Sequence, residues 1–207
     1  KELGTKLAVV TGSNGKTTVK EMIASIFAKA VGVDKSLSTK GNFNNEIGLP
    51  LTLLRLRQEH TLAVVELGMN HPGETKYLAQ IASPDIALIN NAQREHQEFM
   101  ATVEAVAHEH ALAIKALPAD GIAIFPLDSP FVQTWYEAAG SRKVLTFIFN
   151  TRGNLGGSTD EFTKVQAELA DVRGFWNERG QLVIQTPYWD EPAQVNLKTL
   201  GNHNALN

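Results

Sequence analysis

Short apolar runs alternate with segments of helical periodicity over the first 150 residues. Runs of strand length occupy residues 6–11, 62–65, 85–89, 121–125 and 143–149. From Thr17 onward, apolar residues recur every three or four positions, which predicts an amphipathic helix after the first strand. Strands that are apolar throughout are typical of a sheet buried on both faces. The pattern therefore predicts an α/β fold with a doubly wound, mostly parallel sheet.

Two more helices are predicted between the later strands. Residues 72–82 have helical spacing, with Pro72 in the first turn, where proline is tolerated. Thr102 is predicted to cap a helix whose apolar stripe runs from Val103 to Ile114. These helices connect successive strands, as a parallel sheet requires.

The pattern changes after residue 150. Residues 151–160 are rich in glycine and polar side chains, which predicts a loop. Short segments follow, separated by turn residues, at 163–172, 174–177, 181–186 and 194–197. Their alternation predicts antiparallel strands. We therefore expect one domain over residues 1–207, with an α/β core at 1–150 and a small antiparallel β appendage at 151–200.

Composition narrows the function classes. The 207 residues are 43% hydrophobic, 19 are Lys or Arg and 22 are Asp or Glu, which leaves a net charge of −3. This balance argues against nucleic acid as the main partner, because phosphate backbones require concentrated basic residues. The chain has no cysteine, so thiolate metal sites and cysteine nucleophiles are excluded. No apolar run has the length of a membrane span or a signal peptide, and we expect a cytoplasmic enzyme.

A phosphate-binding loop is the strongest local motif. Residues 11–18 read Thr-Gly-Ser-Asn-Gly-Lys-Thr-Thr, between a predicted strand and a predicted helix. Gly12, Ser13, Asn14 and Gly15 would surround phosphate oxygens with backbone N–H groups, and the helix N-terminus and Lys16 would add positive charge. Thr17 or Thr18 would offer a hydroxyl group to Mg²⁺. Val10 stands where the general motif has its first glycine, so this is a shortened variant.

Other polar residues come where a parallel sheet would gather them. Glu66 directly follows the second strand run and is a candidate metal ligand. His96 follows the next strand run and is a second candidate. His110 falls on the apolar stripe of its helix and faces inward, whereas His108 lies on the polar face. Asn42 and Asn45 lie in an amide-rich loop, for which chemistry alone favours a structural turn.

Together these motifs resemble the Mur ligase family, whose members form amide bonds at the expense of ATP in peptidoglycan synthesis. The resemblance rests on residues 12–18, Glu66-Leu67-Gly68, Asn90-Asn91 with His96, and residues 201–204. Residues 16–22, 41–54 and 68–74 are most similar to the members that add D-Ala-D-Ala to UDP-MurNAc-tripeptide. The family has three domains, and the chain resembles the central ATPase domain alone. The resemblance implies that the protein is a monomer. It also implies that the central domain by itself would not catalyse ligation.

The resemblance also implies roles for individual residues. Lys16 would hold the β- and γ-phosphates of ATP, and Thr17 with Glu66 would bind one Mg²⁺. His96 would serve a second Mg²⁺. Many family members have a carbamylated lysine at the position of His110, so this histidine would ligate or orient the second metal instead. The remaining implied contacts are those of His203, Asn204 and Asn207 with the adenosine, and of Asn42 and Asn45 with the muramoyl-peptide.

Two alternatives remain open at this point. One is a related ligase, similar to folylpolyglutamate or cyanophycin synthetases. The other is a P-loop nucleotide-binding module without ligase activity. The chain lacks an Asn-Lys-x-Asp pattern for reading guanine, which counts against a GTPase.

Overall fold

The computed structural model describes residues 3–94, 99–150 and 169–196. Its core elements are β1 (Lys6–Thr11), α1 (Lys16–Val31), η1 (Val33–Lys35), β2 (Ser36–Ser38), α2 (Gly48–Leu53), β3 (Leu62–Glu66), α3 (Glu74–Ala82), β4 (Ile86–Ile89), α4 (Val103–Lys115), β5 (Ile122–Pro126), α5 (Val132–Ala139) and β6 (Lys143–Asn150). Three more strands follow, β7 (Val172–Trp176), β8 (Leu182–Gln185) and β9 (Ala193–Val195). Strands and helices therefore alternate up to β6, as the sequence predicts.

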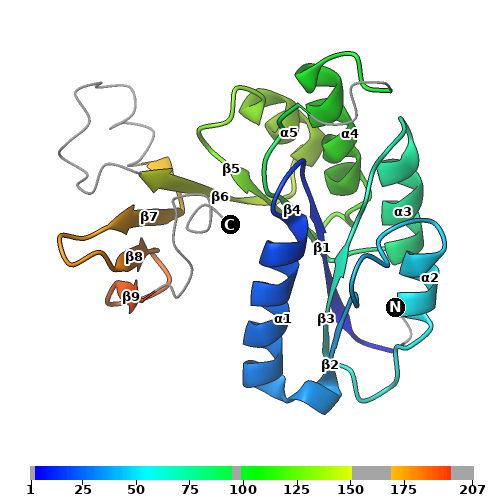
Figure 1. Cartoon of the computed structure of the whole chain (residues 1–207), viewed down its shortest axis with the longest axis horizontal. Helices are drawn as coiled ribbons and strands as arrows, with labels where there is room; N and C mark the ends of the chain where they lie inside the picture. Colours follow the sequence, from blue (N-terminus) through cyan, green and yellow to red (C-terminus); the bar gives the residue numbers. More distant parts are fainter. Residues whose placement is uncertain (1–2, 95–98, 151–168, 197–207) are drawn as a thin grey trace.

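All of these strands belong to one sheet, in the order β2-β3-β1-β4-β5-β6-β7-β8-β9 (Figure 1). Pairing is parallel from β2 to β7 and antiparallel between β7, β8 and β9. The predicted α/β fold with a mostly parallel sheet and antiparallel strands near its end is confirmed. One detail differs, because β7 pairs parallel with β6 and so makes the β-rich part a continuation of the main sheet.

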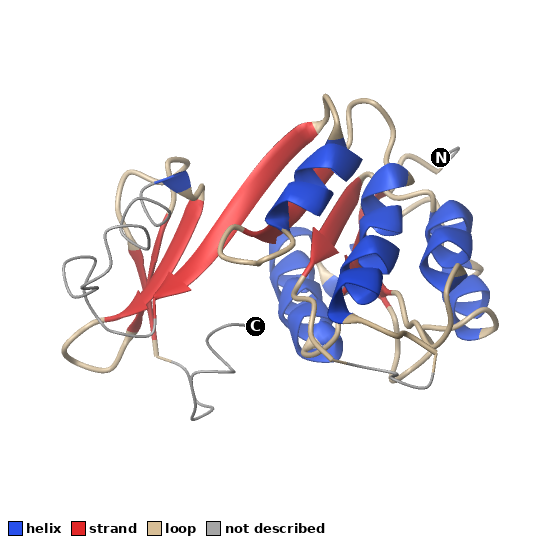
Figure 2. Ribbon diagram, turned by 90° about the horizontal axis from the view of Figure 1, so that it is seen from above, coloured by secondary structure: helices blue, strands red, loops and turns tan. Residues whose placement is uncertain are grey.

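Helices cover both faces of the sheet, and Figure 2 shows its strands between them. On one face α1 packs against Ala8, Val10 and Val64. On the other face α2, α3, α4 and α5 contact one another in series and enclose the larger core, which includes Val9 and Val65. Neighbouring strand residues thus point to opposite cores, which explains why the interiors of these runs are mainly apolar.

Four elements were not predicted, one of them the three-residue 3-10 helix η1, and two boundaries were wrong. The predicted break between segments 163–172 and 174–177 falls inside β7, whereas the loop predicted at 151–160 and the start of the segment at 163–172 lie outside the described residues. The strand β2 and the helix α2 have three and six residues, too few for a periodicity to be recognised. The eight-residue helix α5 was also missed. Pro72 is not in the first turn of α3, because the helix begins at Glu74 with Gly73 as its N-cap. The N-cap role predicted for Thr102 is confirmed, since its side chain accepts a hydrogen bond from the Ala105 amide.

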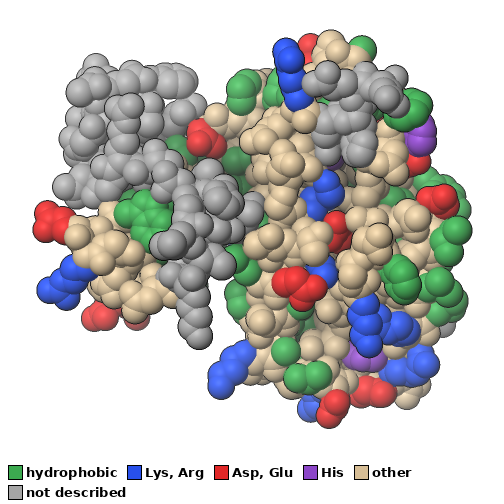
Figure 3. Space-filling model, in the orientation of Figure 1, with side chains coloured by type: hydrophobic (Ala, Val, Ile, Leu, Met, Phe, Trp, Pro, Cys, Tyr) green, Lys and Arg blue, Asp and Glu red, His purple; other side chains and the backbone are tan. Residues whose placement is uncertain are grey.

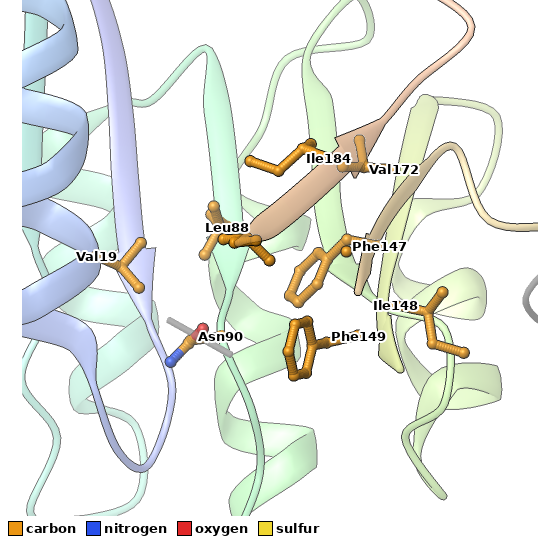
Figure 4. Close-up of a pocket in the computed structure, with 10 residues that line it drawn as sticks. Val19, Leu88, Asn90, Phe147, Ile148, Phe149, Val172 and Ile184 are labelled. Atoms are coloured by element: carbon orange, nitrogen blue, oxygen red, sulfur yellow. The ribbon is translucent and has the colours of Figure 1, made fainter. Parts of the chain in front are cut away.

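The face covered by α1 is hollowed where the sheet passes from β4 to β8. A cavity of about 210 Å³ lies there, lined mainly by apolar side chains (Figure 4). Val19 of α1 and Leu88 of β4 border it on one side, and Phe147, Val172 and Ile184 border it on the other. Within the described residues, part of this apolar sheet face is therefore not covered by α1.

Charged side chains are mixed over the visible surface. Figure 3 shows basic and acidic groups interspersed on one face of the molecule. Among the described helices, none combines the length and apolar character needed to cross a membrane.

Candidate phosphate and metal site

Three adjacent strands end together at one edge of the sheet. Val10 of β1 lies beside Glu66 of β3, and Thr11 lies beside Ile89 of β4. From β1 the chain continues through α1 to β2 and β3, which lie on one side of β1 in the sheet, and later reaches β4, which lies on the other side of β1. Helix α1 covers one face of the sheet, and α3 and α4 cover the opposite face. In such sheets, ligands bind at the carboxyl ends of the strands where the order reverses. The loop after β1 occupies this position.

The loop from Gly12 to Gly15 takes a conformation that requires glycine. Gly12 has φ +136°, and a Cβ atom there would lie 3.0 Å from the Asn91 nitrogen. Gly15, the N-cap of α1, has φ +77°. Both glycines are thus demanded by backbone angle, and Gly12 also by the close approach of the chain after β4. The Lys16 ammonium group lies over the loop and donates to the Gly12 and Ser13 carbonyl oxygens, at 2.6 and 3.0 Å.

The segment after β4 fixes the phosphate loop from the other side. The Asn14 amide donates to Asn91 Oδ1 at 2.9 Å, and the Asn14 carbonyl accepts from Asn90 Nδ2 at 2.7 Å. Ser13 Oγ donates to the Gln93 carbonyl and accepts from the Gln93 amide. These side chains satisfy part of the loop's own hydrogen-bonding capacity and hold its shape in advance of any ligand. Gln93 was missed by sequence reasoning, because nothing in its neighbourhood marked it.

The Glu66 carboxylate is buried next to the first turn of α1. Its Oε2 accepts from Thr17 Oγ1 at 2.9 Å, and its Oε1 accepts from Asn44 Nδ2 at 2.8 Å. Only 2% of this residue is exposed. A carboxylate and a hydroxyl oxygen in contact beside a phosphate loop are the hard oxygen donors that Mg²⁺ prefers. The residues present therefore fit the cation, and Thr17 rather than Thr18 is the hydroxyl brought to the carboxylate.

A fully buried lysine lies one turn further along α1. Lys20 Nζ donates to the Thr39 carbonyl at 2.9 Å and to the Glu21 carboxylate. Thr39 Oγ1 in turn accepts from the Glu66 amide. The chain after β2 is thus tied both to α1 and to the end of β3. A buried ammonium group is tolerated only with such partners, because removing one leaves an uncompensated charge.

The amide-rich loop contributes a residue that the sequence did not single out. Asn44 reaches Glu66, whereas Asn45 Oδ1 accepts from the Gly48 amide at 2.8 Å and so begins α2. Asn42 is exposed on the same loop. The sequence marked this stretch as amide-rich, and the resemblance implied roles for Asn42 and Asn45 but none for Asn44.

His110 lies beneath the phosphate loop. It is 1% exposed, and its Nδ1 lies 3.0 Å from Thr11 Oγ1, the last residue of β1. The prediction that His110 faces inward is confirmed. His108 is exposed on the opposite side of α4, with its Nε2 4.0 Å from Glu104. The expectation that the two histidines do not share a site is therefore also confirmed.

Glu109, between these histidines, was missed entirely. Its Oε1 accepts from the Gly73 amide at 2.9 Å and from the Thr75 amide at 3.0 Å. These are free N–H groups at the start of α3, whose own N-cap is a glycine without a capping side chain. Glu109 therefore caps α3 from α4, and only the tertiary structure brings the two together.

Replacing Glu109 by alanine should lower the free energy of unfolding by about 2–3 kcal/mol, because two shielded amides lose a charged acceptor. Urea unfolding monitored by circular dichroism would measure it. Glu104→Ala, on the exposed face of the same helix, is the control and should cost less than about 1 kcal/mol. Equal effects of the two substitutions would show that Glu109 has no special capping role.

Several predicted site residues lie outside the described residues. They are His96, His203, Asn204 and Asn207. Within the described ranges, no three histidine or carboxylate side chains come together as a metal cluster. The described part of the site thus consists of the phosphate loop, Thr17 with Glu66, and His110 behind them.

The model of the Mur ligase middle domain matches residues 10–207. The chain belongs to the Mur ligase family. Among curated Mur ligases, the UDP-N-acetylmuramoyl-tripeptide–D-alanyl-D-alanine ligase of Escherichia coli K12 is 35% identical over 202 residues. That alignment covers 98% of this chain and 41% of the relative, so the chain spans about two fifths of its length.

Solved Mur ligase structures have the same fold. A crystal structure of MurF from Acinetobacter baumannii superposes with a TM-score of 0.81 at 30% identity, over 98% of this chain and 40% of that one. MurF from Thermotoga maritima in complex with ADP gives a TM-score of 0.70 at 26% identity, over 93% of this chain and 40% of that one.

Proposed function

We propose that this chain is the ATP-binding domain of a ligase that joins D-Ala-D-Ala to UDP-MurNAc-tripeptide. ATP would phosphorylate the terminal carboxylate of the tripeptide, and the amine of D-Ala-D-Ala would displace phosphate from the acyl phosphate. The substrates are those in the names of the chain's relatives. The observation that carries the proposal is the contact of Thr17 with the buried Glu66 directly beside the phosphate loop.

The described residues support this chemistry in distinct ways. The loop amides and the N-terminus of α1 favour an anion, and Lys16 would exchange its two carbonyl partners for the β- and γ-phosphates. Thr17 and Glu66 would hold Mg²⁺. When bound, this ion supplies positive charge against the phosphate oxygens. The protein's task is then to align the carboxylate with the γ-phosphate and to stabilise the developing charge.

The second metal site is a separate part of the proposal. We assign it to His96, with His110 behind it as a direct or water-mediated partner. The Thr11 hydroxyl group orients the His110 ring through Nδ1, which directs Nε2 to the opposite side of the ring. His203, Asn204 and Asn207 would contact the adenosine, and Asn42 and Asn45 would lie near the muramoyl-peptide.

The test is an assay of the longer ligase that carries this chain as its middle domain. Phosphate release should require ATP, UDP-MurNAc-tripeptide and D-Ala-D-Ala together. ATP hydrolysis that is indifferent to both peptide substrates would contradict the proposal and favour a nucleotide-binding module. Activity with glutamate or another amine instead of D-Ala-D-Ala would favour a related ligase. Residues 1–207 alone should bind ATP weakly and ligate nothing.

A further inference from the structure

A histidine and a carboxylate form a pair on the loop that follows β3. His71 Nδ1 lies 2.9 Å from Glu74 Oε1. The side chains are 51% and 33% exposed, so the pair is accessible to a ligand. Neither residue has a part in nucleotide or magnesium binding as described above.

The loop that carries His71 is held in one conformation by two carboxylates. Glu74 Oε2 accepts from the Asn70 and His71 amides, at 2.6 and 3.1 Å. Glu109 accepts from the Gly73 and Thr75 amides. Four backbone N–H groups within six residues are therefore bound to carboxylates, which holds the backbone of this loop in place. The contact of Nδ1 with Glu74 then orients the His71 ring.

The electrostatics of Glu74 agree with this arrangement. Partial burial opposes its ionisation, but hydrogen bonds from the Asn70 amide and from the His71 ring and amide outweigh this effect. The pKa of the Glu74 carboxyl group is consequently lowered from its ordinary value. An ionised carboxylate at Nδ1 accepts the proton there, so Nε2 of the neutral ring presents a lone pair.

The loop lies at the same edge of the sheet as the phosphate site. The Leu67 amide donates to the Val10 carbonyl, and the Gly68 amide donates to the Asn44 carbonyl, so the loop leaves β3 next to the Glu66 contacts. The His71 ring also packs against Phe99, with ring centroids 4.3 Å apart. Phe99 belongs to the segment between β4 and α4. His71 thus lies on one segment that borders the proposed reaction site and contacts a second through Phe99.

We propose that His71 is the general base that deprotonates the ammonium group of the acceptor. This inference rests on the proposed function, in which the acceptor's amine is the nucleophile. A lone pair on Nε2 suits this group, because an ammonium ion can only donate hydrogen bonds. Glu74, on α3, contacts the His71 ring, and Glu109 of α4 binds the Gly73 and Thr75 amides of the same loop.

In the proposed step, the acceptor's ammonium group loses two protons in turn, and the acyl phosphate loses phosphate. Nε2 takes one proton from the ammonium group, and the imidazolium ion formed is stabilised by the Glu74 carboxylate. The freed amine lone pair attacks the carbonyl carbon of the acyl phosphate. The carbon–nitrogen bond forms, the carbon–oxygen bond to phosphate breaks, and phosphate leaves with that electron pair. The second amine proton passes to solvent, leaving the neutral amide.

The test separates the two half-reactions in the longer ligase. In the His71→Ala variant, acyl phosphate formation from ATP and UDP-MurNAc-tripeptide, trapped with borohydride in the absence of acceptor, should stay within about twofold of wild type. The kcat/KM for D-Ala-D-Ala should fall by about 10²–10⁴, the usual contribution of a general base. Added imidazole should restore part of this loss.

A matched control is available on α4. His108 is also an exposed histidine beside a glutamate at helical spacing, and His108→Ala should change neither half-reaction. Unchanged kcat/KM in His71→Ala would overturn the proposal, and so would an equal loss in both half-reactions, which would indicate a structural role. If the wild-type enzyme traps no acyl phosphate, the proposed function itself fails.

Discussion

Lys16→Ala should raise the Kd for ATP at least about 100-fold, which corresponds to about 2.8 kcal/mol at ~1.4 kcal/mol per tenfold change. The ammonium group is the full positive charge that lies over the phosphate loop, where it is bonded to the Gly12 and Ser13 carbonyl oxygens. Loss of a charged hydrogen-bonding partner in a binding site typically costs about 2–5 kcal/mol. Isothermal titration of the longer ligase with ATP and Mg²⁺ would measure the change.

Lys29→Ala is the matched control for this substitution. Lys29 is exposed in the last turn of the same helix, about 20 Å along its axis at 1.5 Å per residue. Its removal should leave ATP affinity within about twofold, because an exposed charge at that distance is largely screened. Wild-type affinity in the Lys16 variant would refute the assignment of residues 12–18 as the nucleotide site.

Glu66→Gln should abolish the dependence of ATP binding on magnesium and lower ligation by at least about 100-fold. A neutral amide cannot offset the charge of the cation, and its NH₂ group would face either Thr17 or Asn44. The fold should survive, with a loss of about 1–2 kcal/mol from the disturbed buried hydrogen bonds. Titrations of ATP with Mg²⁺ and with EDTA would separate the metal effect from the nucleotide effect.

Glu46→Gln provides the comparison for Glu66. Glu46 is an exposed carboxylate on the loop that supplies Asn44, and its replacement should leave the magnesium dependence unchanged. If the Glu66 variant bound ATP with Mg²⁺ as tightly as wild type, Glu66 would not be a ligand of the metal.

Local sequence signals predicted the phosphate loop, Glu66 and the inward direction of His110. In each case the information lies within one segment. The glycines and Lys16 follow one strand, Glu66 ends another, and His110 shares the apolar spacing of its helix. The parallel sheet then brings these segments together, because adjacent parallel strands end at the same edge.

The contacts of Asn44, Gln93 and Glu109 could not be predicted in the same way. Asn44 is one of three asparagines in four residues, and its role depends on the distance from its loop to β3. Glu109 is 34 residues from Thr75, and no local pattern indicates that α4 lies against the start of α3. Such partners become visible only when the packing of the helices is known.

Both edges of the described sheet end in three-residue strands, β2 and β9. So short a strand exposes few unpaired backbone groups, and the chain after β2 is already bound to Lys20 through the Thr39 carbonyl. A strand from a second molecule could therefore form few backbone hydrogen bonds with either edge of the sheet. The short borders therefore protect the described sheet, with its seven inner strands, against edge-to-edge aggregation.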